Sequence, residues 1–318
     1  MTEDEIRSVD ARASRFMEEG IDLMRAGDAG QALPLFERAL ELRRGLPVNL
    51  PVHAYGLAAC WLNRAEALSQ LGPAYDALTL PAYNEALALL RRLPLRDDVR
   101  FSMRLAIACQ NRALILAAQG KPAAVDAIAS LTEAIAVLDQ VEGMVASERD
   151  FLLAVAWMNL ANVQVFHATG ASELAAQQAA RRALALVKGQ ERNDARAAEI
   201  GLKARHVLCH LVARRLSLSE QREKLMSDVH EATDLADDGL ELIREWEQRG
   251  NAWFRAFAND FVRFGARTYA RYQPRFLLEF TQEQLHASDC PNSYNASREM
   301  QDAARDIAPL LAKYAAGG

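Results

Sequence analysis

The chain has 318 residues, of which 51% are apolar and 25% charged, and its formal net charge is −5. This length allows two ordinary domains or one long helical-repeat array, and the apolar content excludes a largely disordered chain. The acidic balance disfavours general binding to nucleic acid or to an anionic membrane surface, because both require a basic field.

Helix-forming residues dominate the chain. Ala, Leu, Arg, Glu and Gln all favour helices, and apolar residues recur at three- and four-residue steps, as in Leu33, Phe36 and Leu40. Glycine and proline fall between such segments. We predict an all-α fold, a right-handed superhelix that forms one solenoid over residues 1–318. Its expected parts are hairpins at 11–46, 52–94, 97–142, 147–190, 194–249 and 251–288, followed by a capping helix at 293–315.

The first predicted hairpin alternates small and large residues around a turn at Gly27-Asp28. Small residues stand where two helices would approach closely, at Gly20, Ala32 and Ala39, and large residues would fill the space between them, at Phe16, Leu23 and Phe36. This spacing resembles the tetratricopeptide repeat family. The resemblance implies stacked antiparallel helix pairs with a concave groove that binds a protein or an extended peptide.

One short motif then recurs three times at a fixed spacing. It reads WLNRAEAL from Trp61, CQNRALIL from Cys109 and WMNLANVQ from Trp157, a period of 48 residues (109 − 61 and 157 − 109). Two sets of equivalent positions follow, the asparagines Asn63, Asn111 and Asn159 and the small residues Ala65, Ala113 and Ala161. A constant period of this kind is typical of stacked helical repeats. These hairpins exceed the usual repeat of about 34 residues, so their helices should carry extra turns.

The resemblance implies that the first helix of each hairpin lines the groove. In that family the recurring asparagine often bonds a peptide backbone, and an amide suits this role because it donates and accepts at once. The alternative, weighted equally, is that these asparagines only join neighbouring helices. The same helical phase adds further groove candidates: Leu62, Glu66, Gln110, Leu114, Met158, Asn162, His206, His210 and Arg214.

The fifth hairpin departs from the motif, because Val207 stands where the asparagine recurs. His206 and His210 are four residues apart and share a helix face, with Cys209 beside them. Two imidazoles at this spacing can bind zinc, but a site needs a third or fourth ligand, so packing is the favoured interpretation and no metal or cofactor is expected. Histidines in the groove would make binding pH-sensitive between about pH 5.5 and 7.

The sixth segment is rich in aromatic residues and arginine. Nine of the 22 aromatic residues fall between Trp253 and Phe280, and Arg263, Arg267 and Arg271 follow one another at steps of four. Arginine beside aromatic rings is typical of interface hot spots and of single-stranded nucleic-acid platforms. The aromatic stripe also suits a helix core, which is the favoured interpretation. An acidic partner, or a homo-oligomer formed through this region, is the alternative.

The cysteines and the N-terminus predict a cytoplasmic protein. Cys60, Cys109, Cys209 and Cys290 form no CxxC pair, and three of them lie in apolar, helix-like segments, where buried free thiols are expected. The opening residues are polar and acidic, without the pattern of a signal peptide. No apolar run approaches the roughly 18 residues of a membrane span.

These features together favour a binding protein over an enzyme. The sequence contains no GxGxxG, GxxxxGK[ST], GxSxG or HExxH motif. The leading hypothesis is a non-catalytic adaptor or scaffold that captures a protein or extended peptide in its concave groove. Two alternatives stay open: a regulatory sensor of peptides or other ligands that controls a partner protein, and a metal-dependent enzyme that uses His206 and His210.

Overall fold

The computed structural model describes residues 1–168, 173–218 and 222–273, together with 276–277, 279–280, 308–309 and 312. Over this part of the chain it contains eleven α-helices and no strand, and successive helices from α1 to α7 and from α8 to α11 pack against one another. This confirms the predicted class, an all-α helical-repeat solenoid. The predicted capping helix at 293–315 and the end of the sixth hairpin lie almost wholly outside the described residues.

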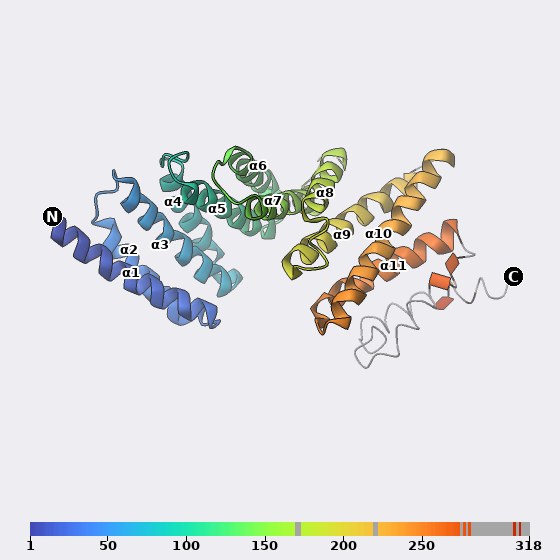
Figure 1. Ribbon diagram of the computed structural model, residues 1–318, viewed down its shortest axis with the longest axis horizontal. Coiled ribbons are helices and arrows are strands. Elements are labelled where there is room, and N and C mark those ends of the chain that lie inside the picture. Colours follow the sequence, from blue (N-terminus) through green and yellow to red (C-terminus); the bar gives the residue numbers. More distant parts are fainter. Residues whose placement is uncertain are drawn as a thin grey trace. The chain divides into compact units, whose positions relative to one another are not determined.

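The chain divides into two compact units, residues 1–170 and 171–318, and the division falls within the predicted fourth hairpin. The first unit contains α1 (Glu3–Arg25), α2 (Ala29–Arg44), α3 (Pro51–Gln70), α4 (Asp76–Leu90), α5 (Val99–Ala118), α6 (Ala124–Gln140) and α7 (Ala146–Phe166) (Figure 1). The second contains α8 (Glu173–Val187), α9 (Ala195–Leu218), α10 (Arg222–Gln248), the short helix η3 (Ala252–Phe254) and α11 (Arg255–Tyr272).

The 48-residue period of the sequence is reproduced by the helix bounds. α5 repeats α3 at both ends (99 − 51 = 48 and 118 − 70 = 48), and the 3-10 turn η2 (Lys121–Ala123) repeats η1 (Pro73–Tyr75) at the same step. Gly72 and Gly120 precede these turns with φ of 100° and 81°. Only glycine adopts this conformation without steric cost, so both hairpins turn at an equivalent glycine.

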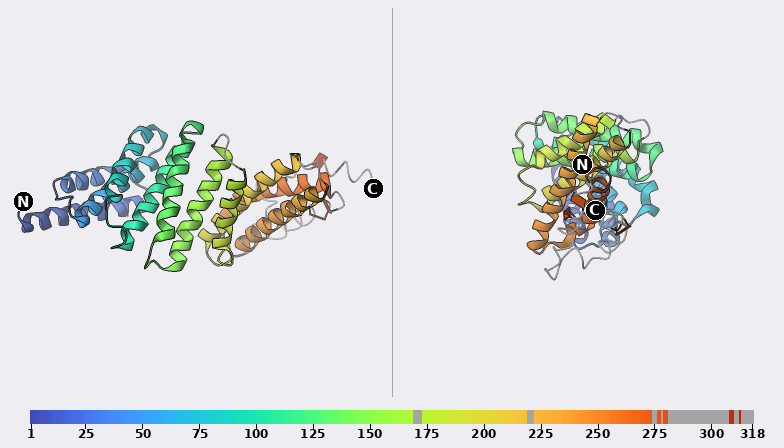
Figure 2. Two further views of the ribbon diagram at one scale, coloured as in Figure 1. Left: turned by 90° about the horizontal axis from the view of Figure 1, so that it is seen from above. Right: turned by 90° about the vertical axis from the view of Figure 1, so that its right-hand side faces the viewer.

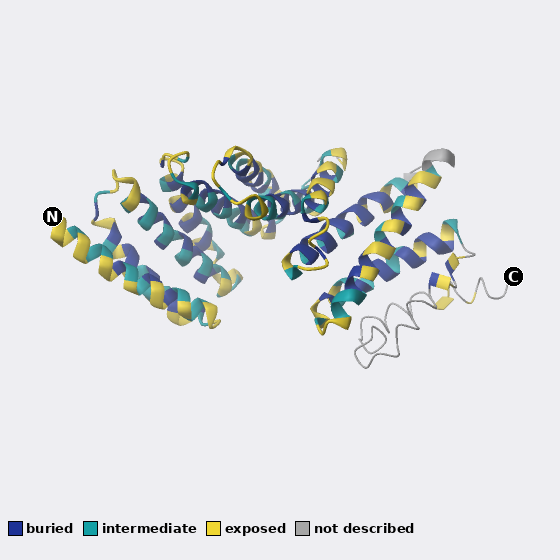
Figure 3. Cartoon of the chain, viewed as in Figure 1, coloured by how far each residue is buried: buried dark blue, intermediate teal, exposed yellow. Residues whose placement is uncertain are grey.

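In the first unit α1, α2, α4 and α6 each bury one face and expose the other, whereas α3, α5 and α7 are mostly buried or half-buried (Figure 3). The three alanines of the recurring motif, Ala65, Ala113 and Ala161, are fully buried. This burial follows because α3, α5 and α7 each pack closely against a neighbouring helix. The succession of helices along the first unit can be followed by colour in Figure 2. In the first hairpin a Cβ at Gly20 would lie 2.5 Å from Cε1 of the buried Phe36. The small residue is therefore required by the aromatic ring packed against it.

The second unit repeats this pairing of a small residue with a ring. Gly239 of α10 packs against Phe261 of α11, where an added Cβ would lie 3.0 Å from the ring. Phe254 and Phe261 are almost fully buried in the same core. The aromatic residues of this segment were predicted to pack in the core. Phe261 does so, whereas Trp253 is 57% exposed. Among the described residues, no helix combines the length and apolarity required to cross a membrane.

Candidate functional site

A pocket of about 420 Å³ lies between α9 and α11 in the second unit. It brings together two groups of residues that the sequence placed on separate surfaces. His206 and His210 come from α9, and Arg263, Arg267 and Arg271 come from three successive turns of α11. Apolar walls, among them Leu216 and Phe264, and the hydroxyl-bearing residues Ser217 and Thr268 complete the lining. The pocket therefore combines a row of guanidinium groups with apolar surface.

Positive charge dominates the lining of this pocket. Three arginines face it, whereas Asp260 is the one acidic residue among its lining residues. The carboxylate of Asp260 lies 3.6 Å from Nε2 of His206. The guanidinium of Arg271 lies over the Tyr272 ring, 5.2 Å from its centroid, a cation–π arrangement that leaves its N–H groups able to donate. The arrangement is suited to an anionic ligand, because arginine forks match carboxylate oxygens.

His210 is held toward its neutral form. Burial lowers the pKa of His210 below its usual range, and the positive charge of Arg214 and the proximity of His206 lower it further, while Glu173 opposes them. A neutral imidazole both donates and accepts, so His210 can hydrogen-bond a ligand without adding charge. An anion in the pocket would favour its protonated form.

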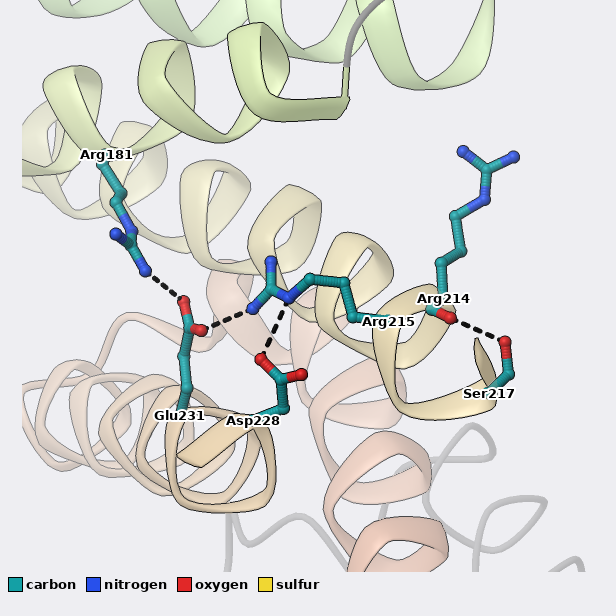
Figure 4. Close-up of polar contacts among 6 residues, drawn as sticks. All are labelled: Arg181, Arg214, Arg215, Ser217, Asp228 and Glu231. Atoms are coloured by element: carbon teal, nitrogen blue, oxygen red, sulfur yellow. Dashed lines mark hydrogen bonds and ion pairs between the residues drawn. The ribbon is translucent and has the colours of Figure 1, made fainter. Parts of the chain in front are cut away.

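Two adjacent arginines of α9 have different roles (Figure 4). Arg215 donates to Asp228 at 3.0 Å and to Glu231 at 2.5 Å, and Arg181 of α8 reaches Glu231 at 2.7 Å. These bonds tie α10 to α9 and to α8. The side chain of Arg214 points away from this network and lies 3.2 Å from Glu173. Arg214, a predicted groove residue, is thus outside the pocket lining, whereas Arg215 fixes the helix that carries the histidines.

A second, smaller pocket of about 280 Å³ lies in the first unit. Ile21, Met24 and Arg25 of α1 and the ring of Phe36 form one side, and the three remaining lining residues, Asn63, Glu66 and Gln70, come from α3. Asn63 and Glu66 are two of the predicted groove residues, and the structure places them in one open depression with apolar walls. No described residue hydrogen-bonds the side-chain amide of Asn63.

The other asparagines of the motif have different environments. Nδ2 of Asn111 donates to Oε2 of Glu66 at 3.4 Å, and the hydroxyl of Tyr83 donates to the same oxygen at 3.3 Å. Asn111 therefore joins α5 to α3, which agrees with the alternative that the motif asparagines only join neighbouring helices. Asn159 is buried and Asn162 is half-buried in α7. A binding role for Asn111, Asn159 and Asn162 stays a prediction.

Four further groove candidates differ in exposure. Leu62, Gln110 and Met158 are buried, and Nε2 of Gln110 donates to the carbonyl of Leu152 at 3.4 Å. Leu114 is 48% exposed. The helical phase predicted Leu62, Gln110 and Met158 to face the groove, but the structure buries their side chains, whereas Asn63, Glu66 and Leu114 stay accessible to different degrees.

The described residues contain no cluster of three or more His, Cys, Asp or Glu side chains arranged to hold a metal ion. Cys209, beside the two histidines, is buried, and burial raises the pKa of its thiol above the usual range. A thiol in this environment is a poor metal ligand, because the thiolate is the coordinating form.

Several lining residues of both pockets were not anticipated. Ile21 and Met24 belong to the first hairpin, and Asp260 and Thr268 flank the arginine row of α11. Two of them could have been found from their spacing. Asp260 lies three residues before Arg263 and Thr268 lies three residues before Arg271, a distance that places two residues on one helix face. The pairing of α9 with α11 follows the repeat, because α1 contacts α3, α3 contacts α5 and α5 contacts α7 in the same way.

No protein-family model matches the chain, and no curated protein matches it.

Proposed function

We propose that the protein is a non-catalytic binding scaffold of the tetratricopeptide type, and that the α9–α11 pocket receives an acidic segment of its protein partner. The family assignment is supported by the first hairpin, where Gly20 packs against Phe36 and Ala32 and Ala39 are fully buried. These are the positions on which the family resemblance rests. Regular hairpins of this kind provide a rigid surface for recognition.

The observation that carries the binding proposal is the row of Arg263, Arg267 and Arg271 along one pocket opposite His206 and His210. A glutamate- or aspartate-rich segment offers carboxylates to the guanidinium groups, and its aliphatic carbons can pack on Leu216 and Phe264. Charge complementarity of this kind favours an acidic partner even though the whole chain carries a net charge of −5.

The test compares two labelled nonapeptides that differ only in charge, one with three glutamates and one with three glutamines, by fluorescence anisotropy with the full chain. The glutamate peptide should bind more tightly, and added salt should weaken its binding. The double variant Arg267→Gln/Arg271→Gln should lose about tenfold in affinity, since each exposed charge pair contributes up to about 1 kcal/mol.

The matched control is Arg92→Gln, which removes an exposed arginine of the first unit and should leave the affinity unchanged. Equal binding of both peptides by the wild-type protein would refute the proposal. An unchanged affinity in the double variant would also refute the assignment of the site to the α9–α11 pocket.

A further inference from the structure

The pocket between α1 and α3 contains the carboxylate of Glu66, which accepts hydrogen bonds through only one of its two oxygens among the described residues. Both donors to Glu66, the hydroxyl of Tyr83 and the amide of Asn111, bond its Oε2 atom. No described group bonds Oε1. Tyr83 is almost fully buried, and its donation holds the Glu66 side chain in place against α4. The carboxylate is thus fixed through one oxygen while the other is available in the pocket.

No cation of the described chain pairs with this carboxylate. Arg25 is the only basic residue in the lining, and its guanidinium lies 3.0 Å from Asp22 on the exposed side of α1. Glu66 is half-buried, so its charge is less well screened than that of a surface carboxylate. A half-buried carboxylate with two neutral donors gains more from an incoming cation than an exposed one would.

The walls around Glu66 are suited to an aliphatic chain. Ile21 and Met24 are half-buried, and the fully buried Phe36 of α2 lies behind them at the pocket. The side chains of Lys and Arg bury their methylene groups against such surfaces while the charged end reaches a polar partner. Beside this surface the amide of Asn63 is open to bond the main chain of the same ligand.

From this geometry we infer that the α1–α3 pocket is a binding site for a basic side chain of a partner peptide. The alkyl part of an arginine or lysine packs on Ile21 and Met24, and its cationic group bonds Oε1 of Glu66. The amide of Asn63 bonds the peptide backbone next to that residue. This site is separate from the α9–α11 pocket in residues and opposite in charge, so it takes a different part of a partner or a different partner.

The experiment uses the full chain labelled with ¹⁵N and three capped tripeptides, acetyl-Leu-Arg-Leu-amide, its lysine analogue and its citrulline analogue. Citrulline keeps the shape of arginine and lacks the charge. Titration is followed through the backbone and side-chain amide resonances of Asn63 and of α1. The cationic peptides should shift these resonances and bind about tenfold more tightly than the citrulline peptide, because only they form a charge-assisted hydrogen bond with Glu66.

Glu66→Gln keeps an oxygen for Tyr83 and Asn111 and removes the charge, so it should abolish the preference for the cationic peptides. Its matched control is Glu85→Gln, an exposed glutamate of α4 outside the pocket, which should leave the preference intact. Met24→Lys provides a second variant. It places an ammonium group within the pocket, where it competes for Glu66 and repels a cation, so it should block binding of the arginine and lysine peptides.

The proposal fails if the citrulline peptide binds as tightly as the arginine peptide, or if the shifted resonances lie away from α1 and α3. It also fails if Glu66→Gln retains the full preference while its thermal unfolding matches that of the wild type. Each of these outcomes leaves the acidic-segment proposal untouched, because that test depends on Arg267 and Arg271 in the second unit.

Discussion

Replacing Arg205 with methionine should destabilise the second unit by about 3–5 kcal/mol, the usual loss when one member of a buried ion pair is removed. Arg205 and Glu191 are joined by two hydrogen bonds of 2.5 and 3.2 Å, and their side chains are only 10% and 9% exposed. The carbonyl of Glu191 also accepts from Nε1 of Trp246 at 2.8 Å. The variant would leave a buried carboxylate without its cation.

The position of Gly201 explains why the carboxylate cannot simply rotate away. A Cβ at Gly201 would overlap the Glu191 carboxylate, so the group is held in a close-fitting space on α9. The expected loss is a large part of the total stability of a domain, which is about 5–15 kcal/mol. Because α9 also carries His206 and His210, loosening it should weaken the α9–α11 pocket as well.

Urea unfolding followed by circular dichroism, together with amide hydrogen exchange of α9, measures this effect. The double variant Glu191→Met/Arg205→Met is compared with Arg205→Met, because it replaces both buried charges with apolar side chains of similar length. It should recover most of the loss, since an apolar replacement of a buried ion pair is often neutral or stabilising. Nε of Arg205 already lacks a hydrogen-bond partner, which adds to this expectation. A loss below about 1 kcal/mol in Arg205→Met, or a double variant that is as unstable as the sum of both single variants, would refute the reasoning.

Three further predictions concern packing, titration and reactivity. Gly20→Ala should cost about 1–3 kcal/mol, since its Cβ would lie 2.5 Å from Phe36, and thermal unfolding of the first unit measures it. Burial and nearby positive charge lower the pKa of His210, so the unfolded chain binds its proton more readily and stability falls as the pH drops below about 6.5. His210→Gln should remove that part of the decline in urea unfolding, and binding of the glutamate peptide should strengthen more between pH 7.5 and 6 in the wild type than in this variant. The thiols of Cys60, Cys109 and Cys209 should stay unmodified by a thiol reagent until the chain unfolds, because burial raises their pKa; rapid modification under native conditions would contradict their buried positions.

Helix bounds are predictable from this sequence where the repeat is strict. The motif alanines, fully buried in α3, α5 and α7, and the glycines at the hairpin turns recur because the same packing geometry recurs. Beyond that region the pattern weakens. Val207 replaces the asparagine of the motif and is buried, so the fifth hairpin carries no marker of its groove face. His206 and Arg263 line one pocket because α9 packs against α11, as the first helices of earlier hairpins pack. The side chains that fill this pocket vary between hairpins, so the period does not predict them.

The three motif asparagines show why a repeat predicts position better than role. Asn63, Asn111 and Asn159 are equivalent in the sequence, and any argument from the period assigns them one function. Their partners come from the residue three positions after the asparagine in the preceding repeat, which varies. For Asn111 that residue is Glu66, and the two side chains bond. For Asn159 the equivalent residue is Leu114, which has no acceptor in its side chain and is 48% exposed.

Asn63 lies in the first of the three copies, where the preceding hairpin supplies Ile21 and Met24 instead of a carboxylate. Its amide is therefore left open beside an apolar surface, while Asn111 is engaged. A substitution series follows from this difference. Asn111→Ala should lower thermal stability by removing one donor from Glu66, at a cost of about 1.5–3 kcal/mol for a bond to a charged group. Asn63→Ala should leave stability nearly unchanged and weaken the tripeptides equally, whether cationic or neutral. The opposite pattern, with Asn63 important for folding and Asn111 for binding, would show that the two asparagines have been assigned the wrong roles.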